Sequence, residues 1–442
     1  MESEFDIRLE QTDGEVKTED DVARAWGVLH KIARAALEAV QPCRLMSRIL
    51  APSPAGTVML RRGTSLTGLS YRRLFVVALG KAAPAMAAAA STYLSAPFVG
   101  IGVAPKGVVS TLPGWLWLQG DHPIPTWRSV RGALAIRSTL TEATREDLAL
   151  VLLSGGSSAL AALPVDRDTT RLRTLTQRLL EEGASIYELN EARRQIDLMK
   201  GGGMARWACP AQVVGLILSD VPGNPLWVIG SGPTTGATPV AVQRSPLVIS
   251  ALDAFSSPQR MPRPRCPFPS PLNFIVGSNE TALEAAAHAA RAHRCQVDMR
   301  PGGLRGEARE IGRRLGHEAL QRAAAHHRHC IVLGGETTVT VRGRGVGGRN
   351  TELAMAFAMT VAYQRSVWLL TLATDGVDGI SPAAGALVGP QTMQQAMNAG
   401  MDPQRAMEDN ASYDFLSAAG ATLRTGPTNT NVADIALVLI NP

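Results

Sequence analysis

Six continuously apolar runs are the feature that most constrains the fold of this chain. Several of them end in Gly, Ser or Asp and lead into helix-like sequence such as KAAPAMAAAASTYL. A run that is apolar at every position, not at alternate ones, suits a strand buried on both faces of a mostly parallel sheet. The pattern therefore predicts an α/β fold. The runs span 72–81, 148–156, 213–221, 272–279, 330–336 and 367–376.

A proline-rich segment suggests where the chain divides. Residues 256–271 hold six prolines and little periodicity, which favours a linker near residue 265. We expect a mobile tail over 1–20, an N-terminal α/β domain over 21–265 and a C-terminal α/β domain over 266–442, each with three of the apolar runs. Open α/β sheets bind ligands at the carboxyl ends of their strands. Two such domains, each with a mostly parallel sheet, would flank an active-site cleft.

Composition excludes several classes of protein. Hydrophobic residues make up 45% of the 442 residues and charged residues 19%, which is enough to bury a core. No apolar run approaches the ~20 residues of a membrane span, and the polar N-terminus does not resemble a secretory signal. We therefore expect a cytoplasmic protein. The net charge of +6 is spread along the chain and aromatic residues make up only 5%, so a solvated surface is favoured over a nucleic-acid interface.

The cysteines argue against a zinc site, and the scarcity of lysines points to a few candidate phosphate-binding residues. Five widely spaced cysteines form no CxxC pair, which favours reduced cysteines over a disulfide framework or a zinc site. Lysine accounts for only five of the 44 basic residues. Since arginine supplies nearly every other cation, a lysine beside a glycine is a candidate for placing a compact ammonium near a phosphate. The expected partner is a small molecule, with no nucleic acid or membrane, and a homodimer is left open.

The segment ALGKAAPAMA (78–87) holds the first candidate residue. A strand is expected to end at Gly80 and a helix to begin near Ala82. Lys81 would then lie at a helix N-terminus, where backbone N–H groups attract anions. The alternative is a packing turn with a solvated lysine.

A second strand-to-helix turn, LLSGGSSAL (152–160), combines glycines with hydroxyls. Gly155 and Gly156 would let a ligand approach the backbone closely, and Ser154, Ser157 and Ser158 offer hydroxyls or an N-cap. The segment matches neither the Walker A motif nor the GxSxG elbow. It favours an anion cradle over a serine nucleophile, with a plain N-cap as the remaining interpretation.

Three further segments carry weaker signals. In NEARRQIDLMKGGGMA (190–205), Asn190, Arg193 and Arg194 share one helical turn and Lys200 precedes the glycines. This pattern predicts an anion-binding edge, although a basic surface helix explains it nearly as well. Asp220 in LSDVPGNP follows a strand and either faces a cleft or caps a turn. His122 lies in the turn-like segment GDHPIP.

The segment GGETTVTVRGRGVGGRNTEL (334–353) contains a literal GxGxxG. No acidic residue follows about 20 positions later, which argues against a dinucleotide site. The glycines instead favour a tight loop that presents Arg349 and Asn350, and an arginine can stabilise charge on a transferring phosphoryl group.

Two acidic residues follow the most apolar run, in ATDGVDG (373–379). Asp375 and Asp378 would lie at the carboxyl end of that strand. One of them could act as a general base or hold Mg²⁺, which takes one or two carboxylates plus phosphates. A turn-forming pair is the alternative.

Taken in order, these motifs resemble the type II glycerate kinases, whose C-terminal part is the MOFRL domain. The resemblance covers about residues 25–440. The chain departs from the family pattern at KGGG, which many bacterial members have as KGGR, and at Asn224, Gly236 and Thr351. The motifs are GKAAPAMA, DHPIP, LLSGGSSAL, NEARR…KGGGMA, LILSDVPGNP, GSGPT, GGETTVTVRGRGVGGRN, TDGVDG and TGPTNTNVADI.

The resemblance implies transfer of the ATP γ-phosphoryl group to the 2-hydroxyl of D-glycerate, which gives 2-phosphoglycerate. It implies that Lys81 and Arg349 stabilise charge on the phosphoryl group, and that Asp375 activates the hydroxyl or holds Mg²⁺. It leaves open which loop binds which anion. The ATP phosphates are assigned to Ser154, Gly155, Gly156, Ser157 and Lys200, and glycerate to His122, Asn190, Arg193 and Asp220.

Two other functions remain open at this point. A hydroxypyruvate reductase using NADH or NADPH has the GxGxxG as its only support. A regulatory domain that binds a phosphorylated metabolite would explain the glycine loops but not the pairing of Arg349 with Asp375.

Overall fold

The computed structural model divides the chain into two compact units, Pro42–Gly277 and Met1–Gln41 with Ser278–Pro442. Each unit is described by itself. Among the described residues, none of the helices combines the length and the apolar character that a bilayer span requires. The structure describes residues 5–10, 20–95, 97–108, 110–182, 184, 186–235, 245–254, 270–324, 327–362 and 366–441.

The unit Pro42–Gly277 is built on a six-stranded sheet in the order β10-β9-β8-β5-β6-β7, in which every neighbouring pair is parallel. Every residue of β5 and β8 is buried, as expected for strands covered on both faces. The strands are β5 (Leu74–Leu79), β6 (Val99–Pro105), β7 (Trp115–Gly120), β8 (Leu148–Leu153), β9 (Gln212–Leu218) and β10 (Leu272–Gly277).

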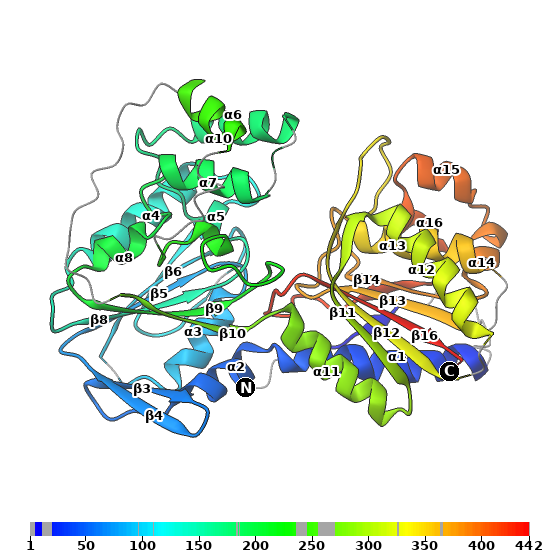
Figure 1. The fold of residues 1–442 in the computed structure, drawn as a ribbon, viewed down its shortest axis with the longest axis horizontal. Coiled ribbons are helices and arrows are strands. Elements are labelled where there is room, and N and C mark those ends of the chain that lie inside the picture. Colours follow the sequence, from blue (N-terminus) through cyan, green and yellow to red (C-terminus); the bar gives the residue numbers. More distant parts are fainter. Residues whose placement is uncertain are drawn as a thin grey trace. The chain divides into compact units, whose positions relative to one another are not determined.

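Helices and a small second sheet complete this unit (Figure 1). The helices are α2 (Pro42–Ile49), α3 (Ala83–Ser91), α4 (Trp127–Leu140), α5 (Ser157–Leu160), α6 (Thr169–Glu181), α7 (Ile186–Ile196), α8 (Gly203–Ala208) and α10 (Pro246–Ala254), with a 3-10 turn at Ile229–Ser231. The small antiparallel sheet consists of β2 (Leu50–Ala51), β3 (Thr57–Arg62) and β4 (Ser65–Ser70).

The other unit contains a seven-stranded sheet in the order β1-β15-β14-β13-β16-β12-β11. Helices α1 and α11 pack on one face, and α12 and α13 pack on the other (Figure 1). The strands are β1 (Arg8–Leu9), β11 (Gln296–Glu307), β12 (His329–Thr338), β13 (Val367–Ala373), β14 (Gly385–Val388), β15 (Thr422–Arg424) and β16 (Asp434–Ile440). The helices are α1 (Asp20–Ala39), α11 (Asn279–Ala292), α12 (Ala308–Ala323), α13 (Arg349–Val361), α14 (Thr392–Asn398), α15 (Pro403–Glu408) and α16 (Ser412–Ala418).

The α/β class is confirmed, and all six apolar runs contain strands. The expectation of a mostly parallel sheet holds only for Pro42–Gly277. In the seven-stranded sheet, β11 and β12 are parallel and every other neighbouring pair is antiparallel. An apolar run reports burial on both faces of a strand and not the direction of its neighbour, so the sequence could not distinguish the two sheets.

The division of the chain also differs from the expected one. The residues around 265 lie outside the described ranges, but β10, which follows them, pairs with β9 and completes the sheet of Pro42–Gly277. Helix α1 packs on α11 and β16, and so belongs with the C-terminal segment. Within the expected mobile tail, Arg8 and Leu9 pair with β15 through backbone hydrogen bonds, which polar side chains do not prevent.

One cysteine also departs from expectation. Cys209 is disulfide-bonded, whereas Cys43, Cys295 and Cys330 are free. The expectation of reduced cysteines throughout is therefore wrong, because spacing along the sequence does not report which sulfur atoms meet in the fold.

Candidate active site

The turn after β5 and the turn after β8 are joined by hydrogen bonds. The Lys81 N–H donates to the Gly155 carbonyl at 2.9 Å, and the Ala82 N–H donates to Ser154 Oγ at 3.0 Å. Gly80 has φ +131°, and a Cβ there would lie 2.1 Å from Ser154 Oγ. Only glycine fits this close approach. The two segments that the sequence singled out are thus one structural feature, since β5 and β8 are neighbours.

Lys81, Gly156 and His122 come together at this edge of the sheet. A Cβ on Gly156 would lie 3.2 Å from His122 Cδ2 and 3.3 Å from Lys81 Cγ. Gly156 has φ +79° and precedes α5, while Lys81 is half-buried and His122 is exposed. The structure therefore places a solvent-accessible lysine and histidine around the Gly155–Gly156 turn.

Two of the three serines of this turn, Ser154 and Ser158, form hydrogen bonds to neighbouring segments. Ser154 is fully buried, and its hydroxyl accepts the Ala82 N–H. Ser157 is also buried, and its Oγ has no hydrogen-bond partner within the described part of the chain. Ser158 Oγ lies 2.8 Å from Ser231 Oγ, and Ser231 in turn donates to Asn190 Oδ1 at 2.9 Å. This chain of contacts connects the serine loop to the GSGPT loop and to α7.

Lys200 lies away from solvent. Its Nζ is 2.7 Å from Asp197 Oδ2, and both side chains are fully buried. Asp197 also accepts the N–H groups of Leu163 and Met199 at 3.0 and 2.9 Å. Burial lowers the pKa of Lys200, although Asp197 opposes that effect. In this conformation the Lys200 ammonium is buried in an ion pair and is not accessible to a phosphate. The ion pair stabilises the turn that follows α7.

The other residues expected on this unit lie on α7 and in the loop after β9. Arg193 is half-buried on α7 with Nε 3.4 Å from Thr176 Oγ1, and burial lowers its pKa despite the nearby Asp197. The buried Arg194 donates from Nη1 to the Trp227 carbonyl at 2.9 Å. Asp220 is half-buried and follows β9.

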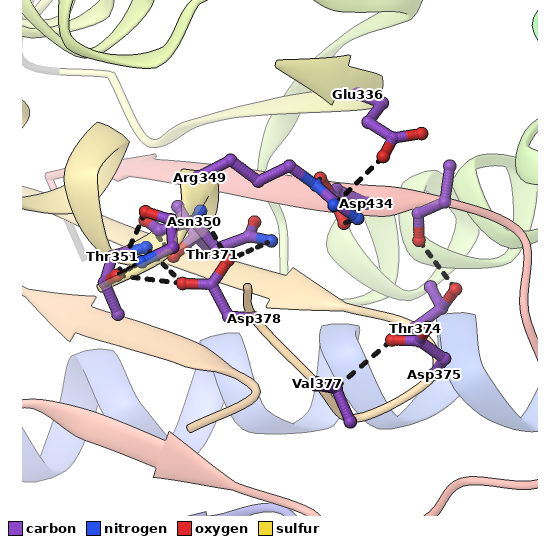
Figure 2. Close-up of polar contacts among 12 residues, drawn as sticks. Glu336, Arg349, Asn350, Thr351, Thr371, Thr374, Asp375, Val377, Asp378 and Asp434 are labelled. Atoms are coloured by element: carbon purple, nitrogen blue, oxygen red, sulfur yellow. Dashed lines mark hydrogen bonds and ion pairs between the residues drawn. The ribbon is translucent and has the colours of Figure 1, made fainter. Parts of the chain in front are cut away.

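On the other unit, the start of α13 is built around Asp378 (Figure 2). Its buried carboxylate accepts the N–H groups of Asn350 and Thr351, both at 2.8 Å, and the Thr351 hydroxyl at 2.9 Å. Burial raises the pKa of Asp378, and these donors oppose the rise. Asp378 therefore serves as a cap for the orphan N–H groups of the helix. Thr351, one of the departures from the family pattern, takes part in this cap.

The Arg349 side chain, at the first position of α13, is held by two carboxylates. Its Nε and Nη2 donate to Asp434 Oδ2 and Oδ1 at 2.5 and 2.9 Å, and Nη1 lies 2.9 Å from Glu336 Oε1 (Figure 2). Burial alone would lower the pKa of Arg349, but the two carboxylates raise it above its usual value. The guanidinium therefore stays charged and fixed in orientation.

Asp375 directly follows Thr374, the first residue after β13. Its Oδ1 accepts the Val377 N–H at 3.1 Å, and the residue is half-buried (Figure 2). Its negative charge contributes to a raised pKa of the neighbouring Asp434, a rise that burial dominates and Arg349 opposes. The structure thus brings Arg349, Asp375 and Asp434 to one edge of the seven-stranded sheet.

Asp434 is the functional candidate that sequence reasoning missed. It begins β16, is 99% buried and contacts Arg349 across 85 positions of sequence. The available signal was an acidic residue directly before the apolar run IALVLI, inside the TGPTNTNVADI motif.

The glycines of the GxGxxG match serve close packing. A Cβ on Gly343 would lie 2.3 Å from Asp409 Cα, and one on Gly345 would lie 2.5 Å from Ala411 Cβ. Asn410 Oδ1 accepts the Arg342 and Gly343 N–H groups at 2.7 and 3.0 Å. The loop lies against the segment before α16, as expected for a loop that presents Arg349.

The residues offer one carboxylate to a magnesium ion. No group of three or more His, Cys, Asp or Glu side chains gathers at a metal-binding distance in the described part of the chain. Asp434 and Glu336 contact Arg349, and Asp375 is the carboxylate that the sequence expected to hold the ion. One carboxylate together with substrate phosphates is a donor set that Mg²⁺ accepts.

Two family models match segments of this chain. The MOFRL family model matches residues 329–434, and the model of a domain of unknown function, DUF4147, matches residues 28–257. The chain is 30% identical to the glycerate 2-kinase of Pyrococcus horikoshii, over 92% of this chain and 95% of that protein. The chain belongs to the type II glycerate kinase family.

Two further relatives complete the comparison of this family member. A protein of Agrobacterium vitis named "Putative hydroxypyruvate reductase" is 36% identical over 83% of this chain and 87% of its own length. The crystal structure of glycerate kinase from Thermotoga maritima is similar with a TM-score of 0.78 and 29% identity, covering 95% of this chain and all of that one.

Proposed function

We propose that this chain is a glycerate 2-kinase, which transfers the γ-phosphoryl group of ATP to the 2-hydroxyl of D-glycerate. The observation that carries the proposal is the similarity to a glycerate 2-kinase over more than nine tenths of both chains. The two clusters of polar residues described above supply the chemistry. Lys81 and Arg349 lie in different units, and each role is argued from the residue's own surroundings.

Lys81 would bind a phosphate of ATP. Lys81 lies beside the Gly155–Gly156 turn, just before the start of α3, where the helix dipole favours an anion. A compact ammonium follows a phosphate oxygen as a point charge. Gly156 leaves the space that Lys81 and His122 occupy. Within this scheme, Ser154 and Lys200 hold the loops in place. The half-buried Gly156 would face the phosphates, and Gly155 and Ser157 are buried on either side of it.

Arg349 would stabilise the charge that develops on the transferring phosphoryl group. A guanidinium carries five N–H donors, and Asp434 and Glu336 occupy three of them. The remaining donors are available to phosphoryl oxygens. Because the cation is already oriented, little reorganisation is needed as the reaction proceeds.

Asp375 would accept the proton of the glycerate hydroxyl. It lies on the same sheet edge as Arg349, and Arg349 remains positively charged there. Kinases use an aspartate in this way to orient the nucleophile and accept its proton. The alternative role of Asp375 is to be the protein ligand of Mg²⁺, which neutralises phosphate charge when it is bound. Glycerate itself would be recognised by polar groups such as His122, Asn190, Arg193 and Asp220.

A phosphorus NMR assay with D-glycerate, ATP and Mg²⁺ tests the function. We expect a 2-phosphoglycerate signal that grows together with ADP. A 3-phosphoglycerate signal would keep the kinase but change the position of glycerate, and folded protein that releases no ADP would refute the proposal. An assay of NADH and NADPH oxidation by hydroxypyruvate tests the reductase. We expect no hydride transfer, because Gly343 and Gly345 are packed against residues 409–411 and Gly348 against Asp378.

A further inference from the structure

Three strands bring acidic residues to a single edge of the seven-stranded sheet. Asp434 begins the central strand β16 and pairs with Gly335 of β12 on one side and Ala373 of β13 on the other. Glu336 follows Gly335, and Asp375 lies two residues after Ala373. The register therefore places the Asp434 and Glu336 carboxylates at the Arg349 guanidinium, and the Asp375 carboxylate near Asp434.

The two carboxylates that contact Arg349 differ in their exposure to water. The Asp434 side chain is 2% exposed and receives two parallel N–H donors in a fork. The Glu336 side chain is 52% exposed and receives one. A forked, desolvated pair fixes the plane of a guanidinium, whereas an exposed ion pair contributes little to stability and exchanges readily with other anions.

The backbone before Asp434 is held in a strained conformation. Ala433 has φ +66°, which an alanine adopts only at a cost in free energy. Its carbonyl accepts both the N–H and the hydroxyl of Thr374, at 3.1 and 2.6 Å. The buried Asn279 amide donates to the carbonyls of Val432 and Asp434 at 2.8 and 3.0 Å. Backbone strain that several surrounding hydrogen bonds hold in place is typical of functional sites, where a side chain needs a fixed orientation.

We propose that Asp434 is the positioning residue for Arg349, and that Glu336 is the counter-ion which an incoming phosphoryl group displaces. The inference rests on the proposed function in that it takes Arg349 to bind the transferring group. Asp434 never touches substrate. It fixes the guanidinium so that the edge now facing Glu336 is presented to the phosphoryl oxygens.

The Asp434→Asn substitution keeps the shape of the side chain and removes its charge. We expect turnover to fall about 10- to 100-fold, as for a small misplacement of a catalytic group, while KM for both substrates changes less than about threefold. Glu336→Gln removes only the competing anion, and we expect it to lower KM for the substrate bound at Arg349. A raised KM in the Glu336 variant would overturn the counter-ion role.

Chemical rescue separates positioning from folding. Arg349→Ala leaves a space beside Asp434 that free guanidinium can enter. Millimolar guanidinium should raise the turnover of the Arg349→Ala variant at least about tenfold. It should not raise the turnover of the Arg349→Ala/Asp434→Asn variant. Equal recovery in the two variants would overturn the proposal.

A binding measurement distinguishes this failure from failure of the proposed function. In a thermal-shift experiment, millimolar guanidinium should raise the melting temperature of the Arg349→Ala variant and not that of the double variant. This readout needs no turnover. If the unaltered protein transferred no phosphoryl group, the thermal shift would still decide whether Asp434 holds the cation.

Discussion

Lys200 Nζ lies 2.7 Å from Asp197 Oδ2, and neither side chain has any exposed surface. Breaking a buried ion pair leaves an uncompensated charge and typically costs about 3–5 kcal/mol. We therefore expect Lys200→Met to lower the free energy of unfolding by that order, measured by urea denaturation. Lys106→Met, at an exposed lysine, is the matched control. A variant with normal stability and a raised KM for ATP would instead show that Lys200 reaches the nucleotide.

Replacing Lys81, unlike replacing Lys200, should lower activity and leave stability unchanged. The Lys81→Ala variant should retain its fold, because Lys81 is half-buried and backbone N–H groups join the two turns. It should lose turnover at least ~100-fold, or about 3 kcal/mol of transition-state stabilisation. Steady-state kinetics with D-glycerate and ATP measure the loss. Lys106→Ala, which also removes a lysine next to a glycine, controls for the general loss of positive charge. Near-normal turnover in folded Lys81→Ala protein would remove Lys81 from the mechanism.

Of the two aspartates in the TDGVDG segment, we expect Asp375 to be needed for catalysis and Asp378 for stability. Asp375→Asn should abolish phosphoryl transfer and leave thermal unfolding unchanged. Asp378→Asn weakens the cap at the start of α13, and should cost about 0.5–2 kcal/mol of stability. Circular dichroism melts and the NMR assay on both variants provide the comparison. Activity that survives in Asp375→Asn would mean that another base, or none, is required.

Acid should destabilise the unit Pro42–Gly277 through Asp147. Burial opposes the charge of this carboxylate, but Arg73 and Thr144 donate to it and lower its pKa from 3.8 to about 2. A depressed folded-state pKa means that the stabilisation is present above pH 3.8 and is lost as pH falls toward 2. Urea unfolding at several pH values should show that loss, and Asp147→Asn should show a smaller pH dependence over that window. An equal slope in both proteins would contradict the assignment.

Local pattern was sufficient for the individual elements of the fold. Each apolar run predicted a strand, and the glycine turns after β5 and β8 predicted the helix starts that follow. Strand partners were not accessible in this way. β10 reads like any other buried strand, yet it completes the first sheet by pairing with β9 after a long proline-rich segment.

The candidate site shows the same division. Residue type and position were enough to single out Lys81, Arg349 and Asp375, because each follows a strand or begins a helix. Lys200 was selected by the same reasoning, and its buried partner Asp197 could not be inferred from a helical spacing that most often places a pair at the surface.

The amino-acid sequence by itself determined which segments become strands, turns and helices, since these depend on neighbouring residues and on hydrophobic periodicity. Only the tertiary structure decided that Asp434 forms an ion pair with Arg349 and that the second sheet is largely antiparallel. The physical reason is that burial and pairing over 85 positions depend on how whole elements pack. A pattern of neighbouring residues cannot specify a contact between residues so far apart in the sequence.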